Sequence, residues 1–378
     1  MNTRTWSWIA LPLALLLTGC PDGGGGEGGF GGGTVPVAYV VSSGPNEVQA
    51  YTVNGTTGAL TVVGSPVALG AAAPTAIAVS PNGSFAYITL NQATNNVLAF
   101  TVDTAIGTLT PVGGSPFDAE ANPTAATVSP NRQFFYVTSS NGTVSAYTIN
   151  GVTGALTSVG AAVGAGTSPS GVIVSPNGAF LYVSNQGSNN VSAFTINGTT
   201  GALTPVAGPP ASPYATTGTS PSAVTVSPNG QFLYVSNQGS DNVSAFTIGG
   251  GGALTLIPST GLNPNPAPVG GTTPNSLTVS PNGQFLFASN GGGNVAAFTI
   301  NGTTGELTAV TGSPFPAGTT PSGITVEPNG QFVYVSNSGG GGNVSGYRIT
   351  AGTGALVSLG AVFPAGTTPV GIATPGRP

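Results

Sequence analysis

The ionisable side chains that could do chemistry are few in this chain. Among 378 residues, four Arg and nine Asp or Glu carry formal charge, and there is no Lys and no His. Schiff-base lysines, imidazole bases, His-rich metal sites and Ser-His-Asp triads are therefore excluded, because each needs a residue type that the chain lacks. A net charge of −5 leaves no basic patch for phosphate backbones, so no nucleic-acid partner is expected. Carboxylates remain as the available general bases and cation ligands.

Four carboxylates are the candidate catalytic residues: Glu47, Asp118, Glu120 and Asp241. Asp118 and Glu120 stand two residues apart in one expected loop, where they could form a cation-binding or general-base pair. The alternative is that they are solvated loop carboxylates, since no Asp-x-Asp-x-Asp-Gly pattern surrounds them. No metal site and no cofactor is predicted.

A repeated turn shows which elements must position these residues. The tetrad Ser-Pro-Asn-Gly begins at Ser80, Ser175, Ser227 and Ser280, and variants begin at Ser129 and Glu327. Successive copies are 46 to 53 residues apart, close to the period of four-stranded propeller blades. Each tetrad lies between two strand-like runs, which predicts a hairpin with Pro at its first central position.

The remaining strand-like runs complete a four-stranded unit. A third run, such as Val191–Ile196, and a fourth, such as the one at Gly201-Ala-Leu-Thr204, each occur seven times. The first copy lacks a first strand, and residues 370–375 resemble the missing piece. The second run is apolar at consecutive positions, as at 180–183, so both of its faces must be covered. The sequence thus predicts an all-β, seven-bladed β-propeller over residues 35–378, with four antiparallel strands per blade, closed by the C-terminal strand joining the N-terminal blade.

The N-terminus is expected to be an export signal. Arg4 precedes an apolar run from Ile9 to Leu17, and the segment ending Leu17-Thr18-Gly19-Cys20 resembles a bacterial lipobox. We expect residues 1–19 to be a lipoprotein signal peptide, Cys20 to be lipidated, and the glycine-rich residues 20–34 to tether the propeller to the cell envelope. The alternative is an ordinary cleavage site beside a free or buried thiol. The sequence does not distinguish the inner from the outer membrane.

The Tyr-Val-Ser-Asn stretches beginning at Tyr182, Tyr234 and Tyr334, with their preceding Pro-Asn-Gly turns, resemble the seven-bladed β-propeller lactonase family. That family is typified by phosphogluconolactonase and overlaps with the YVTN repeat proteins of cell surfaces. The resemblance spans about residues 35–378 and implies the propeller fold. It also implies basic and acidic side chains around the mouth of the central channel. This chain departs from that pattern, so no catalytic residue is carried over.

Antiparallel connectivity divides the loops between two faces. The tetrads and the turns between third and fourth strands share one face. The other, the variable-loop face, comprises the turns between second and third strands, such as 185–190 and 237–242, and the connections between blades. The four candidate carboxylates are expected on this face, where function on a rigid scaffold usually resides.

Two functions are consistent with this arrangement. We favour a membrane-anchored, extracytoplasmic binding or structural surface module that engages a glycan, peptide or envelope partner, because reactive groups are scarce. The alternative is a lactone hydrolase or cyclase of the propeller lactonase family that uses the loop carboxylates.

Overall fold

A computed structural model describes residues 36–207, 212–260 and 263–375, and all regular structure among them is β-strand. The predicted signal peptide, Cys20 and the whole predicted tether lie outside the described residues. None of the described residues belongs to a helix of the length and apolarity needed to cross a membrane.

The described strands form seven antiparallel sheets, each with four strands on its main path. The innermost strands are β4 (Pro74–Val79), β8 (Pro123–Val128), β13 (Pro169–Val174), β18 (Pro221–Val226), β23 (Pro274–Val279), β28 (Pro321–Val326) and β32 (Pro369–Ala373). The second strands are β1 (Val37–Ser42), β5 (Phe85–Leu90), β9 (Phe134–Ser139), β14 (Phe180–Asn185), β19 (Phe232–Asn237), β24 (Phe285–Asn290) and β29 (Phe332–Asn337). The third strands are β2 (Glu47–Val53), β6 (Val97–Val102), β10 (Thr143–Ile149), β15 (Asn190–Ile196), β20 (Asn242–Ile248), β25 (Asn294–Ile300) and β30 (Asn343–Ile349).

The outermost strands differ between blades. They are β3 (Leu60–Ala68), β7 (Leu109–Pro111), β11 (Leu156–Ser158), β16 (Leu203–Pro205), β21 (Leu254–Leu256), β26 (Leu307–Ala309) and β31 (Leu356–Pro364). In four blades a two-residue strand adds a second, short pairing with the third strand: β12 (Val163–Gly164), β17 (Tyr214–Ala215), β22 (Ala267–Pro268) and β27 (Phe315–Pro316). Blade 1 contains β1 to β3 and β32, and blades 2 to 7 follow in chain order.

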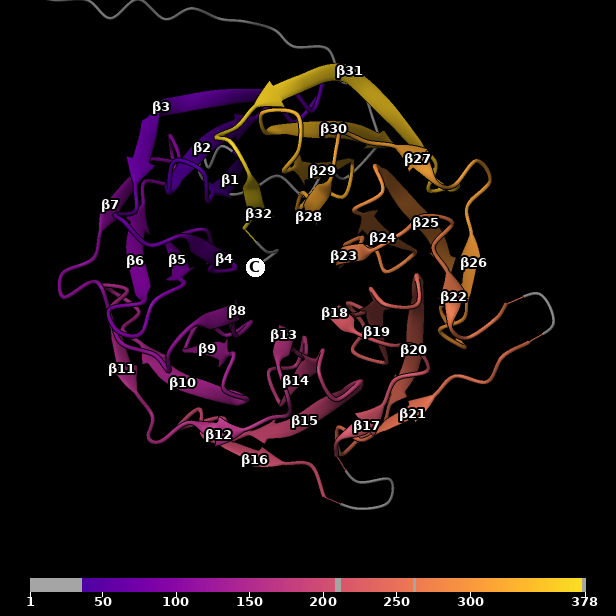
Figure 1. Ribbon diagram of the computed structural model, residues 1–378, viewed down its shortest axis with the longest axis horizontal. Helices are drawn as coiled ribbons and strands as arrows, with labels where there is room; N and C mark the ends of the chain where they lie inside the picture. Colours follow the sequence, from indigo (N-terminus) through magenta and orange to yellow (C-terminus); the bar gives the residue numbers. More distant parts are fainter. Residues whose placement is uncertain (1–35, 208–211, 261–262, 376–378) are drawn as a thin grey trace, which may run out of the picture. The chain divides into compact units, whose positions relative to one another are not determined.

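The seven sheets close into a ring (Figure 1). Each innermost strand contacts the next one, from β4 through β28 to β32, and β32 contacts β4. The C-terminal strand β32 pairs with β1, with Tyr39 opposite Ala373 and Val40 opposite Ile372. The predicted fold class is confirmed, including closure by the C-terminal strand within the N-terminal blade.

The hydrophobic core lies between neighbouring blades. One cluster, for example, joins Tyr136 of β9 to Leu181 and Val183 of β14, and all three side chains are fully buried. Removing such apolar surface from water stabilises a fold by roughly 25 cal/mol per Å². This packing explains why the second strands are apolar on both faces.

The tetrad builds a hairpin whose polar groups are satisfied internally. In blade 4, Ser175 Oγ donates to Asn177 Oδ1 at 2.7 Å and accepts from the Phe180 N–H at 2.9 Å. Gly178 has a φ of 72°, in the left-handed region that glycine occupies without strain. Arg132 takes the same position in blade 3 with a φ of 65°.

A tyrosine of the second strand fastens each blade but one to its neighbour. In blade 4, Tyr182 Oη donates to the carbonyl of Gly252, in the outer turn of blade 5, at 3.1 Å. Equivalent bonds of 2.8 to 3.0 Å join Tyr39 to Gly107, Tyr87 to Gly154, Tyr136 to Gly201, Tyr234 to Gly305 and Tyr334 to Gly58. We call this hydrogen bond the tyrosine latch. Blade 6 has Phe287 at this position, so it lacks the latch.

Candidate functional site

The loops of the variable-loop face are held together by short hydrogen bonds. The Gln186 N–H, in the turn after β14, donates to the carbonyl of Ser168, in the connection into blade 4, at 2.8 Å. The Gln238 N–H donates in the same way to Ser220 in blade 5, at 2.9 Å. Ser168 and Ser220 precede the first proline of an inner strand and have φ values of 51° and 52°. Each connection therefore reaches its inner strand through a fixed left-handed residue.

Asp118 and Glu120 lie in the connection from blade 2 to blade 3 but point to different loops. Asp118 Oδ1 accepts the backbone N–H of Asn95, in the turn between β5 and β6, at 2.5 Å. Glu120 Oε2 accepts from Asn141 Nδ2, in the turn between β9 and β10, at 3.1 Å. Their separate partners give no support to a shared cation or a coupled pair.

Asp241 and Glu47 belong to two further blades. Asp241 Oδ1 accepts the Thr273 N–H at 2.7 Å, and Oδ1 of the neutral Asn189, at the same place in blade 4, accepts the Ser220 N–H at 2.7 Å. The hydrogen bond that Asp241 makes therefore does not require a charged side chain. Glu47, in blade 1, lies against the connection at Gly366, where an added Cβ would come within 2.6 Å of Oε1. Burial, and to a lesser extent the Glu47 charge, raises the pKa of Tyr51 to about 12.

An open depression lies on this face between blades 3 and 4. It is lined by the turn Ser140–Gly142 and by the connection Gly164–Ser168, and it measures about 720 Å³ including the solvent above it. The walls are small residues and backbone, without a charged side chain. Asn141 lies in the wall and links it to Glu120, since Thr143 Oγ1 donates to Asn141 Oδ1 at 2.7 Å and leaves Nδ2 for the carboxylate. Of the four candidates, Glu120 is the one tied to a residue that lines this depression.

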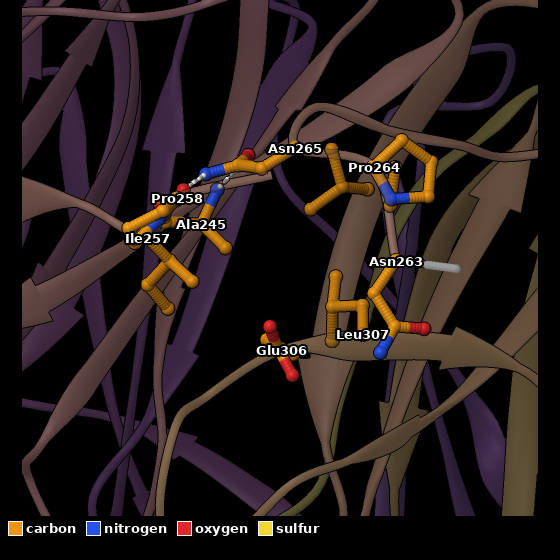
Figure 2. Close-up of a pocket in the computed structure, with 10 residues that line it drawn as sticks. Ala245, Ile257, Pro258, Asn263, Pro264, Asn265, Glu306 and Leu307 are labelled. Atoms are coloured by element: carbon orange, nitrogen blue, oxygen red, sulfur yellow. Dashed lines mark hydrogen bonds between the residues drawn. The ribbon is translucent and has the colours of Figure 1, made fainter. Parts of the chain in front are cut away.

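A second pocket lies elsewhere, on the outer rim of blade 5 (Figure 2). Glu306 and Leu307, from blade 6, lie opposite Ile257 and Asn265, and Asn265 Nδ2 donates to the carbonyls of Ala245 and Ile257 at 2.8 and 2.6 Å. Its free space admits no more than a water-sized molecule. The Asn265 side chain here fixes the long connection between blades 5 and 6, and the pocket is too small to bind a ligand.

The most perturbed carboxyl lies on the opposite face. Glu327 replaces the serine of the tetrad in blade 7, and it is fully buried. Burial raises the pKa of Glu327 to about 7, while the nearby amides of Gln331 and Phe332, the Asn329 side chain and Arg348 lower it in part. Neither carboxylate oxygen of Glu327 receives a hydrogen bond from the described residues. Without access to solvent, Glu327 is not placed to act on a substrate.

Sequence reasoning placed the loops that contain Asn141, Gln186, Gln238 and Asn275 on this face, but it gave these four residues no role. Gln186 and Gln238 occupy the same place in two Asn-Gln-Gly-Ser repeats, which was the available signal. The described residues contain no group of three or more Asp, Glu, Cys or His side chains that could hold a metal ion. The four carboxylates, spread over blades 1, 2 and 5, stay predictions as catalytic residues.

The architecture and the loop-bearing face define a seven-bladed β-propeller. A family model described as "Lactonase, 7-bladed beta-propeller" matches residues 33–170, 114–217 and 206–319, which together are more than half of the chain. The chain belongs to this lactonase family. No curated protein matches it.

Solved structures with the same fold include three bacterial proteins. A candidate 6-phosphogluconolactonase from Bacteroides uniformis has a TM-score of 0.74 at 19% identity, covering 90% of this chain and 99% of its own. A second candidate, from Bacteroides fragilis, has a TM-score of 0.74 at 22% identity, covering 90% and 98%. The periplasmic gluconolactonase of Pseudomonas aeruginosa has a TM-score of 0.72 at 19% identity, covering 91% and 100%. At these identities the likeness shows the fold alone.

Proposed function

We propose that this protein is a lactone hydrolase that opens an uncharged lactone on the variable-loop face, with Glu120 as the general base. Membership of the lactonase family supports the reaction class. The observation that carries the choice of residue is the hydrogen bond from Asn141, a wall residue of the depression, to Glu120 Oε2. Glu120 is exposed, so its other oxygen can meet water.

The reaction needs one base and one water. Glu120 takes a proton from water as the water oxygen bonds to the lactone carbonyl carbon. The bond between that carbon and the ring oxygen then breaks, and the protonated Glu120 returns the proton to the ring oxygen. The product is a hydroxy acid. Asn141 fixes one carboxylate oxygen, which leaves the other oriented for proton transfer.

The charge of the face favours an uncharged substrate. Both arginines among the described residues lie away from it: Arg132 is in a tetrad turn, and Arg348 donates to the carbonyl of Thr56 at 2.6 Å, in an outer turn of blade 1. A phosphorylated lactone would meet carboxylates without a basic partner, which disfavours its binding.

Matched variants test this assignment. The propeller is assayed against a panel of neutral and phosphorylated sugar lactones, with spontaneous hydrolysis subtracted. Glu120→Gln should lower kcat at least 100-fold, since general-base catalysis typically contributes about 10²–10⁴. Asp241→Asn is the control, because Asn189 shows that an amide makes the same bond. Equal losses in both variants, or none in Glu120→Gln, would contradict the role of Glu120.

A second candidate is the binding or structural surface module. It is favoured by the way Asp118 and Asp241 each accept a backbone N–H from another loop, as loop-fastening residues do. Its ligand would be a glycan, peptide or envelope component held at the variable-loop face. Binding of a neutral glycan without turnover of any lactone in the panel would support it.

We also propose that the protein is exported and lipid-anchored to the bacterial cell envelope through Cys20. The lipobox-like segment supports this location, and a structure of the same fold is described as periplasmic. Cys20→Ser should move the protein from the membrane fraction to the soluble fraction. Unchanged fractionation would count against the anchor.

A further inference from the structure

Three amide side chains on the variable-loop face form a continuous chain of hydrogen bonds across blades 4, 5 and 6. Gln186 Nε2 donates to Gln238 Oε1 at 3.2 Å, and Gln238 Nε2 donates to Asn275 Oδ1 at 3.0 Å. Asn275 Nδ2 then donates to the carbonyl of Pro321, on the inner strand of blade 7, at 2.7 Å. We call Gln186, Gln238 and Asn275 the amide relay.

The last partner fixes the direction of the whole relay. The Pro321 carbonyl can only accept a hydrogen bond, so Asn275 must turn its NH₂ group toward it. Asn275 Oδ1 then faces Gln238 and requires a donor, which fixes the Gln238 amide. Gln238 Oε1 in turn requires the Gln186 NH₂ group. Bonds arranged head to tail in this way polarise one another in the same sense.

The relay ends at an exposed glutamine whose backbone contacts the wall of the depression. Gln186 is exposed, and among the described residues its Oε1 receives no hydrogen bond. Its backbone N–H donates to Ser168, which lines the depression. Glu120, through Asn141, borders the same depression from the blade 3 turn, opposite the connection that holds Ser168.

We propose that the amide relay presents Gln186 Oε1 to the hydroxyl groups of an uncharged sugar-type ligand bound at the depression, and thereby selects against phosphorylated ligands. The inference rests on the proposed function, because it names how that site would choose its substrate. An exposed amide oxygen accepts from hydroxyl donors, whereas a phosphate offers only acceptors and is repelled. The fixed orientation of the Gln186 amide would thus distinguish neutral from phosphorylated ligands without a charged residue.

The position of Asn275 in the other blades supplies a variant that keeps the fold. Its equivalents on the inner strands are Thr75, Thr124, Ser170, Ser222, Ser322 and Val370. Asn275→Val therefore places a side chain that blade 1 already carries at this position. It removes the anchor to Pro321, so the amides of Gln238 and Gln186 become free to turn over, although Gln186 itself is unchanged.

Binding of a neutral sugar lactam, a lactone analogue that resists hydrolysis, and of its phosphate ester is measured by calorimetry. The wild type should prefer the neutral lactam. Gln186→Ala should weaken neutral binding roughly threefold to tenfold, the loss of one hydrogen bond. Asn275→Val should lower the preference for the neutral lactam by a similar factor. Gln92→Ala is the control, since Gln92 lies on the same face but its side chain donates only to the Asn95 carbonyl within its own turn.

The outcomes separate the relay from the proposed reaction. Lactam binding with the expected preferences, but no lactone turnover, would remove the hydrolase and leave the relay standing. Turnover of lactones with an unchanged preference in Asn275→Val would overturn the relay alone. A wild type that prefers the phosphate ester, or binds neither lactam, would also overturn it.

Discussion

Phe287→Tyr should restore the one missing tyrosine latch of the propeller. In six blades the tyrosine hydroxyl donates to a glycine carbonyl of the next blade, at 2.8 to 3.1 Å. The corresponding carbonyl in blade 7 is that of Gly354. A Cβ added there would collide with the ring of Phe285 in blade 6, just as one at Gly252 in blade 5 would collide with Phe180 in blade 4. The added hydroxyl therefore meets an acceptor in a place already shaped for it.

The magnitude follows from the burial of the latch. A buried hydrogen bond of this kind contributes about 1 kcal/mol net, so Phe287→Tyr should raise the free energy of unfolding by about that amount. Unfolding entropy of about 2.1 cal/mol/K per residue converts this into a rise in Tm of only about 1–2 °C for a ring of this size. Chemical denaturation at equilibrium is therefore the better assay.

The reciprocal variant is Tyr182→Phe, which leaves the buried carbonyl of Gly252 without its donor. It should lower the free energy of unfolding by about 1–2 kcal/mol. If Phe287→Tyr destabilises the protein as much as Tyr182→Phe does, the new hydroxyl finds no acceptor in blade 7, and this hydrogen bond is not a repeated feature of the interfaces between blades.

Two further predictions concern the tetrad turns. Arg132→Gly should stabilise the protein by about 1 kcal/mol in urea denaturation, because Arg132 has a φ of 65° where the five other tetrads have glycine; no change would mean that the turn bears no strain. Glu327→Gln should remove a pH dependence of stability. The pKa of Glu327 is about 7 in the folded protein and about 4.5 in the unfolded chain, so the unfolded chain loses this proton first as the pH rises. The stability that the protonated carboxyl contributes below about pH 4.5 is therefore lost as the pH rises to 7. The wild type should lose up to about 3 kcal/mol across that window and the variant should not, as measured by denaturation at pH 4 and pH 8; parallel pH profiles would show that Glu327 is not buried as an acid.

The sequence was sufficient for the architecture because its repeats encode local structure. The Ser175 tetrad carries its own hydrogen bonds within six residues, and it recurs at the blade period. The apolar second strands indicated that the blades pack face to face. The C-terminal segment at Val370, which resembles a first strand, indicated where the ring closes. The Tyr182 latch was missed because it joins residues 70 apart, between a strand and a turn that look unrelated in the sequence.

The site was less accessible from the sequence. Asp118 and Glu120 are neighbours in the chain, yet each carboxylate turns to a different loop, and that choice depends on loop geometry. The burial of Glu327 follows from its place in a tetrad, which the sequence did show, but its raised pKa depends on the packing of blade 7. Gln186 was visible only as part of a varied loop, since its partners come from other blades.

The hydrolase proposal is tested most directly by the rate of acid release from an uncharged sugar lactone, followed at constant pH with and without the wild-type protein. Saturable release well above the spontaneous rate, and faster than with the phosphate ester of the same lactone, is the expected result. Release no faster than the spontaneous rate for every uncharged lactone tried would contradict it, and would leave this lactonase-family propeller as a binding protein.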